Sequence, residues 1–242
     1  MVELSSKEYR RKFEKLQAII GYQFNDVGLL HEALVHPSII VRNDQGRVLN
    51  YERLEFLGDS VLSLVIAEIL MELYPDDAEG PLAKRQSALV KGESLALIAN
   101  KLNIGHYLIM TAGEESIGGR SNPSNIENAL EAIIGAIFAD SGRLPEVREF
   151  IRMHFQPLAA AMVNPPKDPK TALQEWAQSR GMEIPLYEMI ESTGPAHSPL
   201  FTVQLNIDQI GQVTATGESK KKAEKDAARQ MLDIINQNQA QS

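Results

Sequence analysis

The sequence contains no cysteine among its 242 residues, which excludes disulfide bonds and thiolate metal sites. It also lacks an apolar run long enough to span a bilayer, so we expect no membrane partner. The charged start, MVELSSKEYRRKFEKLQ, lacks the apolar core of a secretion signal, and we expect a cytoplasmic protein. Basic residues are outnumbered by acidic ones, 24 to 32. The net charge of −8 argues mildly against a nucleic-acid partner unless a local basic patch meets it.

The chain changes its pattern about two thirds of the way along. Up to about residue 155, apolar residues recur at three- and four-residue spacing, which is typical of packed helices. Four prolines between 157 and 169 then indicate a linker. We predict an all-α domain at 1–155, a linker at 156–167, a small α+β domain at 168–236 and a polar tail at 237–242.

The predicted small domain has the order α-β-β-β-α. Helices are expected at 171–181 and 220–235, and strands at 186–192, 201–207 and 211–217. In the second strand, apolar residues from Phe201 to Ile207 alternate onto one face. This order favours two layers, with both helices on one face of an antiparallel sheet. Trp176, the only tryptophan, is interpreted as a packing residue.

Three acids precede a strongly apolar run in the stretch NYERLEFLGDS. On an ideal helix Glu52, Glu55 and Asp59 lie within about 60° of one another. Their repulsion must be offset by basic residues, by protonation or by a divalent cation. A solvated acidic face is the usual meaning of such a stripe. Phe56 on the acid side and the apolar run that follows favour a functional site instead.

A second apolar helix carries another acid. Glu131 lies in NIENALEAIIGAIFAD, one turn after Asn128. Two buried helices that each present oxygen ligands can build an all-oxygen cation site, which favours Mg²⁺ or Mn²⁺ over zinc. Such sites commonly serve phosphoryl chemistry.

These stretches resemble the ribonuclease III family. The likeness rests on YERLEFLGDSVLS, KRQSALVKGESLALIA, GEESIGGR and ALEAIIGAIFADSG, in the family's order, and on the upstream ALVHPS. At the C-terminal end, DPKTALQEW and ATGESKKKAEKDAARQML resemble a double-stranded-RNA-binding domain. The resemblance covers nearly the whole chain.

The resemblance implies a homodimeric endoribonuclease that cleaves double-stranded RNA by metal-activated water, with a role in ribosomal and messenger RNA processing. Its products would carry 5′-phosphate and 3′-hydroxyl ends with a short 3′ overhang. By position, Asp59 and Glu131 would be catalytic, and Glu52 an accessory acid. Glu55, Asp59, Asn128 and Glu131 would bind Mg²⁺, for which Mn²⁺ may substitute, and Phe56 would lie at the dimer interface.

One position departs from the family pattern. Asn128 stands where the family usually has an aspartate, so the site would hold one carboxylate fewer and need more Mg²⁺. Glu127 lies about 100° away around the helix and is a poor substitute. Alternatively, Asn128 hydrogen-bonds a neighbouring acid. The departure is also the only support for another function, a catalytically weakened dimeric double-stranded-RNA-binding protein.

RNA contacts are expected in the C-terminal domain. Lys220, Lys221, Lys222 and Lys225 begin a helix, whose N-terminus favours phosphate, and they can bridge the narrow major groove of A-form RNA. A solvated lysine run is the alternative. The resemblance adds minor-groove contacts at Thr171, Gln174 and Glu175, and at Pro195 and His197 in the first strand loop. His31 and His36 have no metal-ligand partner in sequence and are interpreted as structural.

Overall fold

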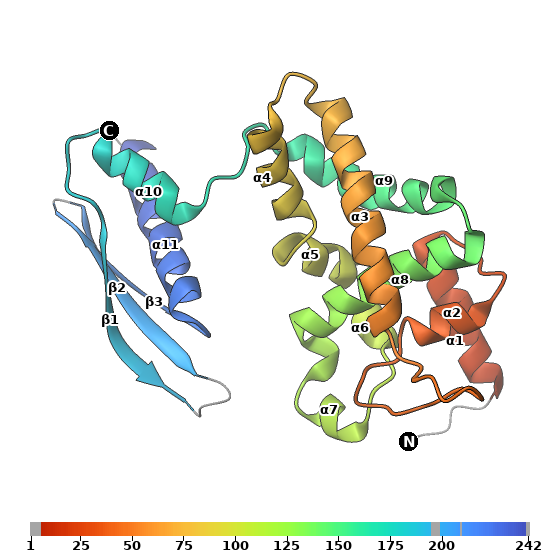
Figure 1. Cartoon of the computed structure of the whole chain (residues 1–242). Coiled ribbons are helices and arrows are strands. Elements are labelled where there is room, and N and C mark those ends of the chain that lie inside the picture. The colour runs from red at the N-terminus through yellow and green to blue at the C-terminus, as the bar shows by residue number, and fades with distance from the viewer. Residues whose placement is uncertain (1–5, 195–198, 209, 241–242) are drawn as a thin grey trace. The chain divides into compact units, whose positions relative to one another are not determined.

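The computed structural model describes residues 6–194, 199–208 and 210–240, and the chain forms two compact units, Met1–Pro166 and Lys167–Ser242 (Figure 1). The first unit is helical, as predicted. Its helices are α1 Ser6–Ile20, α2 Val27–Glu32, α3 Glu52–Leu73, α4 Glu79–Leu89, α5 Glu93–Lys101, α6 Ile104–Tyr107, α7 Ala112–Ser116, the 3₁₀ helix η1 Gly119–Ser121, α8 Pro123–Ser141 and α9 Leu144–Ala161.

Helices α3 and α8 form the centre of this unit and pack directly against each other (Figure 1). Two glycines bring their backbones together. A Cβ atom on Gly58 would collide with the carbonyl oxygen of Glu131, and one on Gly135 would collide with the carbonyl oxygen of Leu54. Since Gly58 lies directly before Asp59, this backbone contact occurs where both helices carry their acids.

Helix α9 extends further than the sequence pattern suggested. It continues to Ala161, with Pro157 inside it, so residues 156–161 are helical where a linker was expected. Phe155 and Ala159 are fully buried in the core of the first unit. The Tyr74 hydroxyl donates to the carbonyl oxygen of Ala159 at 2.6 Å and fixes the last turn. Burial of this helix face outweighs the local effect of the proline.

The second unit has the predicted α-β-β-β-α order. Its elements are α10 Pro169–Gln178, β1 Leu186–Thr193, β2 Leu200–Ile207, β3 Gly211–Gly217 and α11 Lys220–Ala240. The strands form an antiparallel sheet in the order β1-β2-β3, and both helices cover one face of it (Figure 1). Leu173, Leu205 and Met231 belong to its core, and Trp176 packs against that core. The predicted fold class is confirmed for both units.

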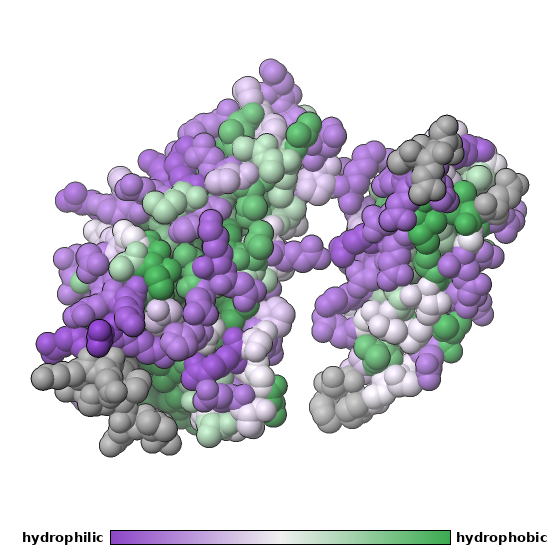
Figure 2. Space-filling model, turned by 180° about the vertical axis from the view of Figure 1, so that it is seen from behind, coloured by the Kyte–Doolittle hydropathy of each residue, from purple (hydrophilic) through white to green (hydrophobic). Residues whose placement is uncertain are grey.

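The face drawn in Figure 2 is largely hydrophilic, with patches of apolar side chains between the polar ones. On α3, Phe56, Leu64 and Met71 are exposed, and Phe56 is 78% exposed. Across the described parts of the chain, every helix is too short or too polar to cross a membrane.

Candidate active site

A cleft of about 440 Å³ lies where α3 and α8 meet. It is lined by all the predicted site residues of the first unit, namely Glu52, Glu55, Phe56, Asp59, Asn128 and Glu131. The other lining residues are Pro37 and Tyr51, which sequence reasoning did not single out. The acids of two helices that are far apart in sequence therefore share one cavity.

The start of α3 positions the outermost acid. Asn50 donates from its side-chain amide to the Glu52 carboxylate at 2.8 Å, and its side-chain oxygen accepts the Glu52 backbone N–H at 3.2 Å. Glu52 and Glu55 lie in the first helical turn, where the positive end of the helix dipole favours negative charge. Glu52 is exposed at the edge, whereas Glu55 and Glu131 are half-buried.

The cleft holds more negative charge than its surroundings neutralise. Burial, followed by the charges of Asp59, Glu55 and Glu127, raises the pKa of Glu131 to about 8. Burial and the charges of Glu52 and Asp59 also raise the pKa of Glu55. Lys91 opposes the shift of Glu131 without cancelling it. The remaining ways to relieve this repulsion are protonation and a divalent cation.

The donor set fits such a cation. Four carboxylates and one amide line the cleft, and oxygen ligands of this kind suit Mg²⁺ or Mn²⁺. Over residues 6–194, 199–208 and 210–240, no three His, Cys, Asp or Glu side chains already converge on a single metal position. Binding of a cation by these carboxylates would require the side chains to move toward one another.

Asn128 is tied to a residue beside the acids. Its side chain and that of Tyr51 both line the cleft. Burial raises the pKa of the Tyr51 hydroxyl to about 12, against the smaller, lowering effect of the contact between the two side chains. Tyr51 and Asn50 directly precede Glu52 in the sequence. Both residues begin the stretch NYERLEFLGDS, and this position was the available signal for their role.

Those predicted RNA-contacting residues of the second unit that the structure describes lie on α10 and α11. Thr171, Gln174 and Glu175 are exposed on α10. Ion pairs from Lys225 to Asp168 at 2.8 Å and from Lys170 to Glu224 at 2.6 Å hold the N-terminal ends of both helices together.

The lysines at the start of α11 are accessible. The side chains of Lys220 and Lys222 are 58% and 56% exposed, and Lys221 is also exposed. The Ser219 hydroxyl accepts the Lys222 backbone N–H at 3.2 Å and caps the first turn. Pro195 and His197 lie outside the described residues.

Known proteins match the chain along nearly its whole length. A family model described as ribonuclease-III-like matches residues 26–158, and one for the double-stranded RNA binding motif matches residues 169–235. Ribonuclease 3 of Anaplasma marginale (strain Florida) is 48% identical over 223 residues, covering 91% of this chain and 94% of the relative. Ribonuclease 3 of Wolbachia pipientis wMel is 46% identical over 222 residues, covering 92% and 95%.

A solved structure of a ribonuclease III domain is also similar to this chain. The nuclease domain of ribonuclease III from Campylobacter jejuni is 43% identical, with a TM-score of 0.53, and the match covers 59% of this chain and 98% of that domain. The two matched family models thus fall, in this order, on the two units of the structure. The chain belongs to the ribonuclease III family.

Proposed function

We propose that the protein is a Mg²⁺-dependent endoribonuclease that cleaves double-stranded RNA and leaves 5′-phosphate and 3′-hydroxyl ends with a short 3′ overhang. One observation carries the proposal: carboxylates from α3 and α8 share a cleft whose negative charge calls for a cation. The second unit, which matches the double-stranded RNA binding motif, supplies the means of holding the substrate. Processing of ribosomal and messenger RNA in the cytoplasm is the cellular role that suits this activity.

Each cleft residue has a task in this reaction. Glu55, Asp59, Asn128 and Glu131 would hold the ion, and Mn²⁺ can replace Mg²⁺ as a hard cation. When bound, the ion supplies activation of water and stabilisation of the departing 3′ oxygen. Asp59 and Glu131 would also touch the reacting groups and orient the water for in-line attack on phosphorus. Glu52, held by Asn50 at the edge, is the accessory acid.

The end of the second unit where α11 begins would hold the duplex. The lysines at the start of α11, Lys220, Lys221, Lys222 and Lys225, are proposed to contact phosphates, and Thr171, Gln174 and Glu175 of α10 the minor groove. The ion pairs between α10 and α11 support this assignment, because they keep both sets of side chains at one end of the unit. Pro195 and His197, which lie outside the described residues, are proposed as further minor-groove contacts. Binding by phosphate contacts and shape would weaken with salt and depend little on sequence.

The direct test is a cleavage assay on a long duplex RNA. We expect Mg²⁺-dependent cutting, inhibition by EDTA, and no cutting of either single strand alone. End-group analysis of the cleavage products should find phosphate at their 5′ ends. Binding of the duplex without cutting at any Mg²⁺ or Mn²⁺ concentration would instead favour the catalytically weakened dimeric double-stranded-RNA-binding protein.

Asn128 sets the charge of the proposed metal site. Asn128→Asp adds a carboxylate to the cleft, so the Mg²⁺ concentration for half-maximal cleavage should fall about tenfold. The measurement is a Mg²⁺ titration of cleavage, paired with the Mg²⁺-dependent rise in melting temperature. Ser124→Asp, at an exposed position of the same helix outside the cleft, adds the same charge and should change neither. An unaltered Mg²⁺ requirement in Asn128→Asp would contradict the charge argument.

Phe56 supports a homodimer in which each subunit cuts one strand. A phenylalanine that is 78% exposed beside a polar cleft is expected to be covered by a second copy. The Campylobacter jejuni structure is described as having a region involved in dimer formation.

Phe56→Ser should therefore raise the dimer dissociation constant about 100-fold, as loss of a central aromatic contact does. Sedimentation of the full chain over a dilution series measures this. Leu97→Ser, which removes another exposed apolar side chain from α5, is the matched control and should sediment as wild type. A dimer that is equally stable in both variants would exclude Phe56 from the interface.

A further inference from the structure

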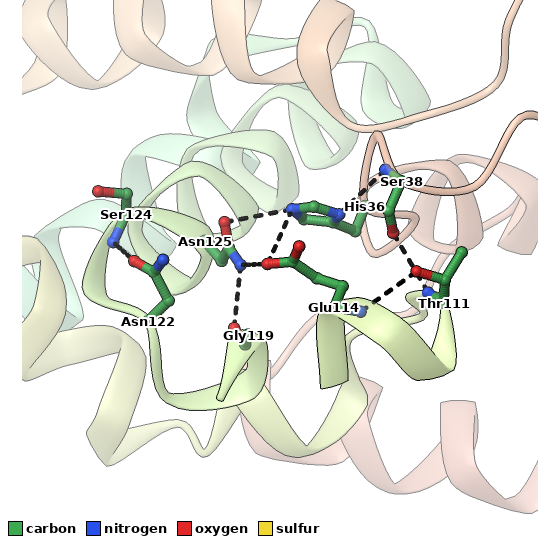
Figure 3. A network of polar contacts seen from close by, with 8 residues as sticks. All are labelled: His36, Ser38, Thr111, Glu114, Gly119, Asn122, Ser124 and Asn125. Atoms are coloured by element: carbon green, nitrogen blue, oxygen red, sulfur yellow. Dashed lines mark hydrogen bonds and ion pairs between the residues drawn. The ribbon is translucent and has the colours of Figure 1, made fainter. Parts of the chain in front are cut away.

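A polar network joins four segments beside the cleft (Figure 3). Its centre is His36, which follows α2 and whose side chain is 12% exposed. Nε2 of His36 lies 3.2 Å from the side-chain oxygen of Asn125 on α8. The Asn125 amide nitrogen donates to Glu114 of α7 at 3.1 Å and to the carbonyl oxygen of Gly119 of η1 at 3.0 Å.

The hydrogen bonds define the state of the imidazole. Its Nδ1 accepts the backbone N–H of Ser38 at 3.0 Å, so Nδ1 carries no proton. The Asn125 amide uses both its hydrogens on Glu114 and Gly119, which leaves its oxygen to accept from Nε2. His36 is therefore neutral and donates from Nε2. Each hydrogen-bond donor in this chain of contacts therefore faces an acceptor.

The network also supports the wall of the metal cleft. Pro37, next to His36, lines the cleft. The His36 ring packs edge-on against Tyr51, with ring centroids 5.7 Å apart and an interplanar angle of 79°. Tyr51 and Asn128 both line the cleft, where their side chains contact each other. Asn125 lies three residues before Asn128 on the same helix, so α8 is held from two sides.

We propose that His36 is a positioning residue for the metal site: through Asn125 and Tyr51 it fixes the side of α8 that presents Asn128. This inference rests on the proposed function. Because His36 does not line the cleft, it acts through its neighbours rather than on the substrate. Losing its bond to Asn125 should loosen the proposed amide ligand and weaken binding of the cation, without affecting how tightly the duplex is held.

Two substitutions separate the hydrogen bonds of His36. Glutamine can present a donor near the Nε2 position, whereas asparagine can present only an acceptor near Nδ1. For His36→Asn we expect an approximately tenfold higher Mg²⁺ concentration at half-maximal cleavage and approximately tenfold lower kcat, since small displacements of ligands are costly. KM for a duplex RNA should change less than about twofold. His36→Gln should recover most of the loss.

The Mg²⁺-dependent rise in melting temperature gives a readout besides activity. In His36→Asn, the Mg²⁺ concentration that gives half of this rise should increase together with the concentration for half-maximal cleavage. His106→Asn makes the same substitution at an exposed histidine of α6 and should match wild type. A wild-type Mg²⁺ half-point in His36→Asn, or equal defects in His36→Gln and His36→Asn, would overturn the inference. A wild-type chain that never cuts would overturn the proposed function instead.

Discussion

Replacing Glu131 by glutamine is expected to abolish cleavage and yet stabilise the metal-free protein above neutral pH. Cleavage should fall at least about 1000-fold, because the change removes a proposed ligand that also touches the reacting groups. The stabilisation has a separate cause. Glu131 is half-buried among Asp59, Glu55 and Glu127, and burial and these charges raise its pKa to about 8. Glutamine occupies the same volume and brings no charge.

The sign of the pH dependence follows from that pKa. The folded protein binds the Glu131 proton more tightly than the unfolded chain, whose carboxyl has its ordinary value of 4.5. The contribution of Glu131 to stability is therefore complete below pH 4.5 and is lost as the pH rises through about 8. Melting in EDTA at pH 5.5 and pH 8.5 should show a smaller loss of stability in Glu131→Gln than in wild type. Mg²⁺ at pH 8.5 should stabilise wild type much more than the variant.

Glu127→Gln is the matched control for this result. Glu127 is a half-buried acid on the same helix, and burial raises its pKa, but it does not line the cleft. Its replacement should leave cleavage within about threefold of wild type, as expected for a residue without a transition-state contact. Cleavage by Glu131→Gln within tenfold of wild type would remove Glu131 from the chemistry. If the metal-free Glu131→Gln variant lost stability between pH 5.5 and pH 8.5 as steeply as wild type, the charge of Glu131 would not be the cause of that loss.

The fold and the main acids could be predicted because their signals are local and periodic. Apolar spacing indicates the central helices, alternation indicates β2, and two separate apolar stretches, NYERLEFLGDS and NIENALEAIIGAIFAD, carry Glu55 and Glu131. The end of α9 was harder to predict from the sequence. Pro157 is a local signal for a helix break, whereas the burial of Phe155 depends on tertiary packing.

The support of the cleft depends on contacts between distant residues. His36 and Asn125 are 89 positions apart, and their partnership has no signature in the spacing of either stretch. The same holds for the contact between Tyr51 and Asn128 in the cleft, where the start of α3 meets α8. Sequence reasoning can identify the residue types that carry chemistry. The neighbours that orient them emerge only when the helices are packed.

Gly58→Ala is expected to destabilise the protein by about 2 kcal/mol or more, although alanine normally favours a helix by about 1 kcal/mol over glycine. The added methyl group would collide with the carbonyl oxygen of Glu131 and approach the backbone nitrogen of Gly135. A backbone atom inside a packed helix cannot rotate away as a side chain can, so α3 and α8 must separate. Urea denaturation of the full chain measures the loss of stability.

The same displacement should impair catalysis in molecules that remain folded. Gly58 lies between Glu55 and Asp59, so moving α3 away from α8 shifts both acids relative to Glu131. A displacement of about 1 Å can cost about 100-fold in rate, and we expect a loss of that size at saturating Mg²⁺, well below the melting temperature. Gly80→Ala supplies the control, since a methyl group there on α4 meets no atom within 4 Å and should leave stability unchanged or slightly raised. If Gly58→Ala behaved like Gly80→Ala in both measurements, close approach of the two helix backbones would not be what sets the geometry of the acids.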